Sequence, residues 1–405
     1  MPLSSAVQSP SAATQDGREL FARLDSLQVD AAVLSPAKRR DALERFLATR
    51  SGREKPGRFW RIDFERIVPE PNAIRSAATV TVEGGGPGCI VTNLTDAAQR
   101  HPELFARAFG RSGAGDGKFG ALAAAFANGG AFVYVPADRA CDEPISIHCG
   151  AADGEAIFPW NVVLVERGAR VAVIEKVSGG AGAFICGVTE IVTAENAAVT
   201  YAVIQNSGPG SRVLSHRIAL PGRDASVAWA SAELGADLAA SEISVRIEAA
   251  GANAEITSLF FPSASQHVDV VSTVDHRAGE ATSETLVKSA ALGDGQARFL
   301  GNIRIAPHAQ GSDARLRDDA LLLSRRAHID SVPALEIGAN DVKAYHGATV
   351  GAIDADQIFY MESRGIERQS AERMIALGFF EPAIERFPTD AMRAELRAQL
   401  AAKLS

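Results

Sequence analysis

A repeat of about 28 residues constrains the fold of this chain more than any other feature of its sequence. Each of four copies opens with a turn-forming residue and an alanine, and the alanines are 28, 28 and 29 residues apart. β-branched residues then alternate with others, which is typical of strands. A near-constant period in the twenties indicates a solenoid whose coils bury their inner faces against their neighbours. The copies are Gly168-Ala169-Arg170-Val171, Asn196-Ala197-Ala198-Val199, Asp224-Ala225-Ser226-Val227 and Asn253-Ala254-Glu255-Ile256.

A fifth copy, Gln296-Ala297-Arg298-Phe299, follows 43 residues after Ala254. The interval between them is therefore predicted to hold an extra strand pair or an insertion. We predict a mainly β fold with a β-helix core at residues 131–352. A two-sheet sandwich also produces short alternating strands at regular spacing, and it stays as the alternative.

The N-terminal region, residues 1–58, is predicted to be helical after a disordered start. Ser35 followed by Pro36 is a typical helix beginning, because serine caps free N–H groups and proline fits the first turn. Residues 59–130 are predicted to be a connecting segment of mixed α/β structure. The apolar residues predicted to face inward in the first two helices are Leu20, Leu24, Leu27, Leu43, Phe46 and Leu47.

A C-terminal helical module is predicted over residues 353–405. Asp354 indicates a helix start, and Gly365 stands where a helix-terminating glycine belongs. Two further helices follow, and the third begins at Thr389 with a stripe of apolar residues at four-residue steps, suited to docking on another surface. The residues predicted to face inward in these two helices are Met374, Ile375, Met392, Leu396, Leu400 and Leu404.

Composition excludes several classes of protein. Only 6% of the 405 residues are aromatic and the net charge is −8, so no nucleic-acid partner is expected. Neither a run of 18 apolar residues nor an apolar leader is present, so we expect no membrane span and no signal peptide. The four cysteines form no CxxC pair, which favours a reducing compartment and a cytoplasmic protein.

The sequence motifs give little support to catalysis. Residues 112–119, SGAGDGKF, lack the spacing of a phosphate-binding loop, and residues 84–88, GGGPG, do not open a strand-to-helix turn. Nucleotide hydrolysis is therefore expected only in a partner. His148 and Cys149 are adjacent in a predicted strand, so they point to opposite faces and cannot both join Cys141 in one metal site.

One enzyme class stays open, a β-helical enzyme acting on a polysaccharide. His267, Asp269, Asp275 and His276 form a polar cluster, and a carboxylate pair with histidine can do acid/base work. This alternative predicts a cleft built around Asp269, Asp275 and His276. A solvated β-helix face gives the same pattern, and no hydrolase motif accompanies the cluster.

Residues 341–366, DVKAYHGATVGAIDADQIFYMESRGI, join a strand-like run, a polar loop with a histidine, and a capped helix. Four further blocks precede them: FANGGAFVYVPADRACDEPISI, VDHR, GNIRIAPHAQGSDA and LLLSRRAHIDSVPALEI. In this order the blocks resemble the SufB/SufD family of iron-sulfur cluster assembly proteins over about residues 121–380. The spelling HGATVG, in place of the EHEAT of SufB-type chains, indicates SufD. Weaker similarity surrounds Trp60, with Ile62 where the family usually has tyrosine.

The resemblance implies a right-handed parallel β-helix with helical N-terminal and C-terminal regions. It also implies a non-catalytic scaffold subunit that pairs with SufB and binds SufC, an ABC-type ATPase, through its C-terminal helices. Such complexes assemble nascent iron-sulfur clusters. A self-pairing homodimer is a further expectation when the partner is missing, because an exposed β-helix edge readily pairs with itself.

The same resemblance implies site residues. The candidates for contact with the ATPase are Phe359, Tyr360, Arg364 and Gly365. Strands near residues 335–342 are the candidates for contact with SufB. His346, predicted to lie in a loop, matches a family position that helps hold the nascent cluster, and neutral imidazole is a ready iron ligand. The family commonly has cysteine two residues earlier, where this chain has Ala344, so the cluster is expected to depend on His346 and on ligands from SufB. Because no set of cysteines has ferredoxin-like spacing, this chain alone is expected to bind no cluster stably.

Overall fold

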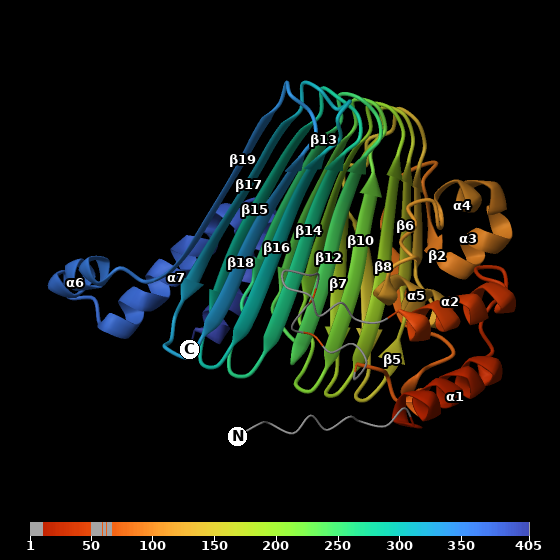
Figure 1. The fold of residues 1–405 in the computed structure, drawn as a ribbon, viewed down its shortest axis with the longest axis horizontal. Helices are drawn as coiled ribbons and strands as arrows, with labels where there is room; N and C mark the ends of the chain where they lie inside the picture. Colours follow the sequence, from red (N-terminus) through yellow and green to blue (C-terminus); the bar gives the residue numbers. More distant parts are fainter. Residues whose placement is uncertain (1–10, 50–58, 60–61, 63–66, 405) are drawn as a thin grey trace, which may run out of the picture.

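The chain folds around two β-sheets that face each other, as the computed structural model in Figure 1 shows. The structure describes residues 11–49, 59, 62 and 67–404. In the core, successive strands alternate between the two sheets, and each pairs in parallel with the strand two places along the chain. This is the predicted parallel β-solenoid, and the parallel pairing excludes the antiparallel sandwich.

In the described part of the chain, one sheet has nine strands and the other ten. The nine-stranded sheet runs in the order β1 (Thr79–Glu83), β4 (Ile145–Ala151), β7 (Arg170–Gly179), β9 (Ala198–Gln205), β11 (Ser226–Glu233), β13 (Asn253–Phe260), β15 (Thr282–Ala291), β17 (Asp313–Leu322) and β19 (Lys343–Ala352). The ten-stranded sheet runs in the order β18 (His328–Ile337), β16 (Gln296–Ile305), β14 (His267–His276), β12 (Leu238–Ile247), β10 (Arg212–Leu220), β8 (Phe184–Thr193), β6 (Trp160–Val165), β3 (Ala131–Val135) and β2 (Ile90–Asn93), with β5 (Ala156–Ile157) beside β8.

Left-handed turn residues explain the repeat. One residue just before each strand from β7 to β17 of the nine-stranded sheet has a positive φ, and its N–H donates to a carbonyl of the next coil. Asn196, for example, has a φ of 56° and donates to the carbonyl of Arg223 at 2.9 Å. Glycine, asparagine and aspartate tolerate this conformation best. The turn residues are Gly168, Asn196, Asp224, Gly251, Glu280 and Gly311.

The register corrects two of the predicted repeat copies. Val227 pairs with Ala254, so the fourth repeat alanine is Ala252, two residues earlier than predicted. The fifth is Ala281, whereas Ala297 lies in β16 of the opposite sheet. The interval 254–297 therefore holds the strand pair β14 and β15 rather than an insertion, and these strands continue the regular alternation between the sheets. The small side chain of each repeat alanine is buried where the chain turns into the strand.

Helices cap the N-terminal end of the solenoid, beside the antiparallel strands β1 and β2 (Figure 1). They bury apolar side chains against the outer face of the ten-stranded sheet. Ser35 caps the second helix as predicted, but Leu47 is 39% exposed because the buried face of that helix centres on Leu43 and Phe46. The elements are α1 (Ser11–Ser26), α2 (Pro36–Ala48), η1 (Pro71–Ala73), α3 (Leu94–Arg100), α4 (Pro102–Ala108) and α5 (Lys118–Phe126). Trp60 lies outside the described residues.

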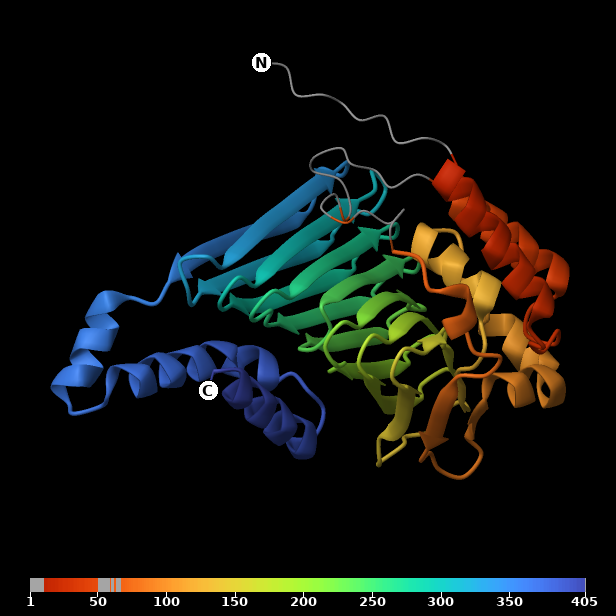
Figure 2. The same ribbon diagram turned by 90° about the horizontal axis from the view of Figure 1, so that it is seen from below.

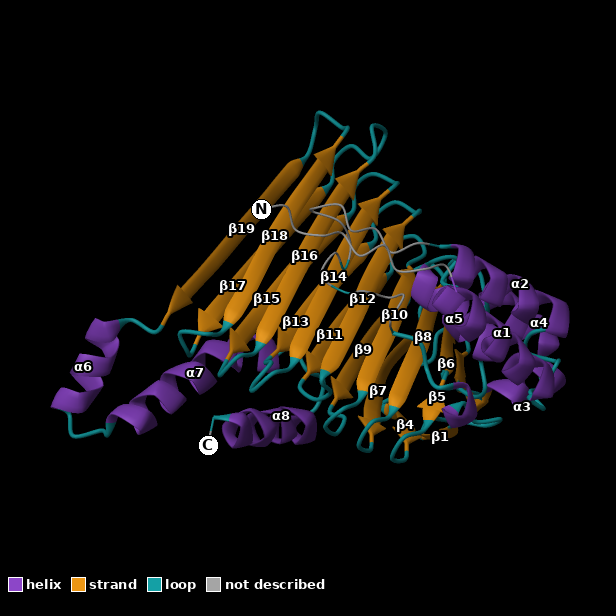
Figure 3. Cartoon of the chain, turned by 60° about the horizontal axis from the view of Figure 1, so that its bottom comes forward, coloured by secondary structure: helices purple, strands orange, loops and turns teal. Residues whose placement is uncertain are grey.

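The C-terminal helices are α6 (Ala355–Ser363), α7 (Arg368–Ile384) and α8 (Asp390–Lys403). Figures 2 and 3 show α7 and α8 lying along the solenoid, while α6 projects from it. The predicted stripe of α8 docks on the chain's own nine-stranded sheet, where Met392, Leu396 and Leu400 are buried. Met374 was predicted to face inward, but it is 55% exposed because α7 turns its Ala376 and Phe380 face to the sheet.

Candidate functional site

The two sheets end differently at the two ends of the solenoid. At the C-terminal end, β19 pairs only with β17 in its sheet and β18 only with β16, among the described strands. Nine of the ten residues of β19 are exposed. Each of these strands therefore leaves one edge of backbone N–H and C=O groups without a neighbouring strand. Long uncovered edges are templates for pairing with another chain.

Exposed apolar side chains gather at this open end, defined here as β18, β19 and α6. Outside it, the large exposed apolar residues of the described chain are Leu47 on α2 and Met374 on the neighbouring α7. Concentrated apolar exposure is typical of an interaction surface. The exposed residues at the open end are Ile337, Tyr345, Val350, Phe359 and Tyr360.

Helix α6 brings the four predicted contact residues together. Its N-cap is Asp354, as predicted, and Gly365, with a φ of +84°, ends it by donating its N–H to Glu362 O at 2.9 Å. Phe359 and Tyr360 are 72% and 59% exposed. The guanidinium of Arg364 lies 5.2 Å from the centre of the Tyr360 ring, a cation–π distance. Helix α6 thus presents an amphipathic surface away from the two sheets.

His346 lies in β19, so its predicted position in a loop is wrong. Its backbone is paired in register with Leu316 of β17, and its side chain is exposed. Strand alternation puts it on the same face as Ala344, which packs against the interior of the last coils. His346 therefore stands at the mouth of the solenoid. Among the described residues, no group of three or more His, Cys, Asp or Glu is placed to hold a metal ion.

Asp318, which no sequence motif singles out, is enclosed in the last coil. It lies in β17 on the inward face with Leu316, and Ser331 of β18 donates to its Oδ2. Its Oδ1 is buried without a hydrogen-bond partner. Burial raises the pKa of Asp318 to about 7. The alternation Leu316-x-Asp318-x-Ala320 was the available signal that this carboxyl faces inward.

The cleft of the polysaccharide alternative is not formed. Asp269 and His276 are fully buried on opposite faces of β14, since their positions differ by an odd number of residues. Asp269 pairs with Arg298 of β16 at 3.5 Å, and His276 bonds Ser283 of the opposite sheet at 2.9 Å. Burial lowers the pKa of His276 to about 4. Asp275 forms an ion pair with Arg277, two residues further along the chain. These residues therefore do not converge on one site. The interpretation as a solvated face also fails, because Asp269 and His276 are buried.

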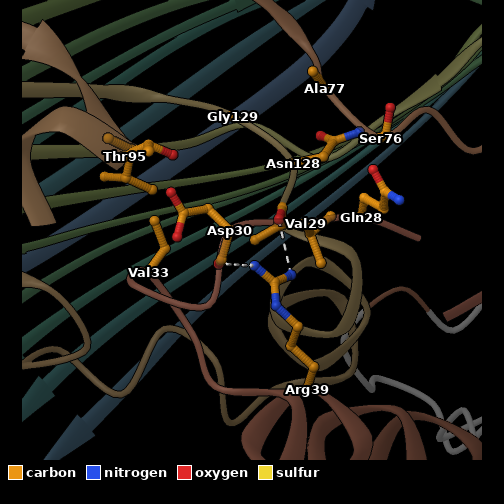
Figure 4. A pocket seen from close by; sticks show the side chains of 12 residues that line it. Gln28, Val29, Asp30, Val33, Arg39, Ser76, Ala77, Thr95, Asn128 and Gly129 are labelled. Atoms are coloured by element: carbon orange, nitrogen blue, oxygen red, sulfur yellow. Dashed lines mark hydrogen bonds between the residues drawn. The ribbon is translucent and has the colours of Figure 1, made fainter. Parts of the chain in front are cut away.

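A cavity of about 220 Å³ lies in the N-terminal cap beside Arg39 (Figure 4). The guanidinium of Arg39 donates to the carbonyls of Ala127 at 2.8 Å and Asp30 at 3.3 Å. Burial lowers the pKa of Arg39 to about 10. Because Ala127 follows α5, this buried cation satisfies carbonyls at the end of that helix. The positive charge of Arg39 beside the cavity thus stabilises the C-terminal end of α5.

The interior of the solenoid holds polar side chains that sequence alternation alone did not reveal. Glu175 accepts hydrogen bonds from Asn161 at 2.8 Å and Tyr201 at 3.0 Å, and the sulfur of Cys149 lies 3.5 Å away. All four are buried. Burial raises the pKa values of both Glu175 and Cys149. His148, adjacent to Cys149, is exposed, as the predicted opposite faces require.

Comparison with known proteins identifies the family of this chain. Residues 148–379 match the family model described as SUF system FeS cluster assembly, SufBD core domain, and residues 81–147 match the SufBD protein N-terminal region. The iron-sulfur cluster assembly protein SufD of Bacillus subtilis (strain 168) is 28% identical over 317 residues, which are 76% of this chain and 72% of that protein.

Staphylococcal relatives give the same result. An iron-sulfur cluster assembly SufBD family protein of Staphylococcus aureus (strain MRSA252) is 27% identical, and one of Staphylococcus saprophyticus is 26% identical. Each match covers 75% of this chain, and the chain spans about two thirds, 66%, of each relative's length. None of the helices described is both long and apolar enough to cross a membrane. With the core family model matching more than half of its length, the chain belongs to the SufBD family of SUF-system iron-sulfur cluster assembly proteins and resembles SufD.

Proposed function

We propose that this chain is a non-catalytic scaffold subunit of a SUF-type complex, which pairs with a SufB-like subunit and binds a SufC-like ATPase. The observation that carries the proposal is the open end, where two uncovered sheet edges adjoin a projecting helix with exposed aromatic residues. A homologous solenoid that continues β18 and β19 would satisfy the free backbone groups. The ATPase would contact α6.

The same proposal covers the nascent cluster, ATP hydrolysis and the location of the protein. The nascent cluster is cargo held at the interface, with His346 as one ligand and the others from the partner, because Ala344 supplies no thiolate. ATP hydrolysis resides in the ATPase. We also propose a cytoplasmic location, for which the four cysteines without a disulfide are the support.

The test is co-purification of the full chain with its cognate SufB-like and SufC-like proteins, followed by native mass determination. A stoichiometric complex is expected. Replacing Phe359 and Tyr360 together by alanine should remove the ATPase but leave the SufB-like subunit bound. The matched control is Leu47→Ala, an exposed apolar residue at the opposite end. A chain that stays alone, or that loses nothing when α6 is changed, would contradict the proposal.

Within a complex that assembles, His346→Ala should lower the iron and acid-labile sulfide retained per complex at least severalfold. His148→Ala is the control, because His148 is also an exposed strand histidine but lies in β4. Ala344→Cys should raise retention, since it supplies the thiolate that the family resemblance implies at this position. Equal retention in wild type and His346→Ala would remove His346 from the site while leaving the scaffold proposal intact.

A further inference from the structure

Two cysteines touch each other at the capped end of the solenoid, opposite the open end. The sulfur atoms of Cys89 and Cys141 lie 3.4 Å apart, and both side chains are only partly buried. Cys149 and Cys186 are fully buried. The chain thus has one pair of thiols in contact that also reach the surface, and reactivity of a thiol follows such exposure.

Cys141 is held in place by the first full coil. Its N–H donates to the carbonyl of Arg170 at 2.9 Å, and Ala140 forms a parallel bridge to Arg170. Moving Cys141 would therefore break backbone pairing with β7.

Cys89 directly follows the glycine-rich loop 84–88, which lies across the segment that carries Cys141. A Cβ added to Gly84 would meet the carbonyl of Pro144 at 3.0 Å, and one added to Gly88 would meet Pro136 at 3.5 Å. Both glycines have positive φ angles. Glycine backbone adjusts readily, so the loop can supply the approach of roughly 1.4 Å that takes two touching sulfurs to bonding distance.

We propose that Cys89 and Cys141 form a reversible disulfide when the chain meets a peroxide. In the first step the Cys89 thiolate attacks one peroxide oxygen, which gives a sulfenic acid and releases the other oxygen as hydroxide or water. The Cys141 sulfur then attacks the Cys89 sulfur, its proton leaves with the hydroxyl group as water, and the S–S bond forms. In sum, two thiols and one hydrogen peroxide give one disulfide and two waters.

Two observations support this proposal. Burial and the neighbouring Cys89 thiol raise the pKa of Cys141 to about 11, so Cys141 keeps its proton until the second step. Among the described residues no third His, Cys, Asp or Glu joins the pair to make a metal site, so the two thiols are not part of a tetrahedral metal site. The bond would close a loop across 52 residues of sequence and tie the cap to the first coil.

The experiment treats the purified full chain with a small molar excess of hydrogen peroxide, then alkylates the free thiols and maps the peptides without reduction. We expect one intramolecular Cys89–Cys141 cross-link in most molecules, reversed by dithiothreitol, with Cys149 and Cys186 unoxidised. The oxidised chain should also melt about 3–6 °C higher than the reduced chain, because closing a long loop restrains the unfolded state.

Cys89→Ser and Cys141→Ser are the matched variants. Each should abolish the cross-link and the rise in melting temperature. The cross-link expected in the wild-type chain is measured independently of how well these variants fold. A wild-type chain whose four thiols all stay alkylatable after peroxide would overturn the proposal. So would cross-links only between molecules, or oxidation of Cys89 to sulfinic acid without a bond to Cys141.

Discussion

Asp318 is a residue whose burial works against stability near neutral pH. Its pKa is raised from 3.8 to about 7, chiefly by burial, so the folded chain binds a proton that the unfolded chain releases above about pH 4. The unfolding free energy contributed by this group therefore falls as the pH rises from about 4 to 7. Above pH 7 a charged carboxylate with one unpartnered oxygen remains in the last coil.

Asp318→Asn should thus stabilise the chain at pH 8, on the order of 2 kcal/mol, and leave it nearly unchanged at pH 4.5. Urea denaturation at the two pH values measures the difference. The adjacent Asp319 is the control. Burial opposes its ionisation, but hydrogen bonds from Lys288 and Thr349 outweigh burial and lower its pKa. Asp319→Asn should therefore destabilise at pH 8, and a gain in both variants would refute the assigned cause.

His346 shows how far residue-level prediction reached. The resemblance selected it and the structure puts it at the mouth of the solenoid, but the glycine that follows it suggested a loop where β19 continues through residue 352. Pairing with β17 decides this, because ten consecutive backbone pairings outweigh the local preference of one glycine. Its role with the cluster stays a prediction.

At the scale of elements, α6 and α8 are both amphipathic helices, and only their neighbours distinguish them. Helix α8 has three buried apolar residues against the nine-stranded sheet, whereas Ile358 is the buried residue of α6. A stripe in the sequence shows that a helix will dock but not on what. The stripe of α8 is thus already occupied within this chain, and α6 is the helix that presents its apolar residues to a partner.

Leu396→Ala in α8 should lower the unfolding free energy by about 2–4 kcal/mol, because it leaves a cavity beneath a fully buried side chain. Phe359→Ala in α6 should change it by less than about 0.5 kcal/mol, since that ring is mostly in solvent. Denaturant unfolding of the isolated chain compares the two. If the Phe359 variant lost as much stability as the Leu396 variant, α6 would be packed rather than free.

For the whole molecule, the contrast between a capped end and an open end predicts self-association when the partner is missing. An uncovered edge of about ten residues pairs with another copy unless charge prevents it. Sedimentation of the isolated chain should show a dimer whose fraction increases with protein concentration. Val350→Lys in β19 should weaken that dimer at least tenfold, and Leu47→Lys at the capped end should not. A wild-type chain that stays monomeric at every concentration would contradict this prediction.

The sequence by itself determined the solenoid and the helices at both ends. A turn residue that accepts positive φ, a small residue and an alternating strand are local features, and local features repeat visibly in a sequence. Tertiary structure alone decided which coil stacks on which. The register placed Ala252 rather than Ala254 in the repeat, enclosed Asp318, and brought Cys89 to Cys141 across 52 residues. Contacts between such distant residues depend on the stacking of coils, which no local pattern records.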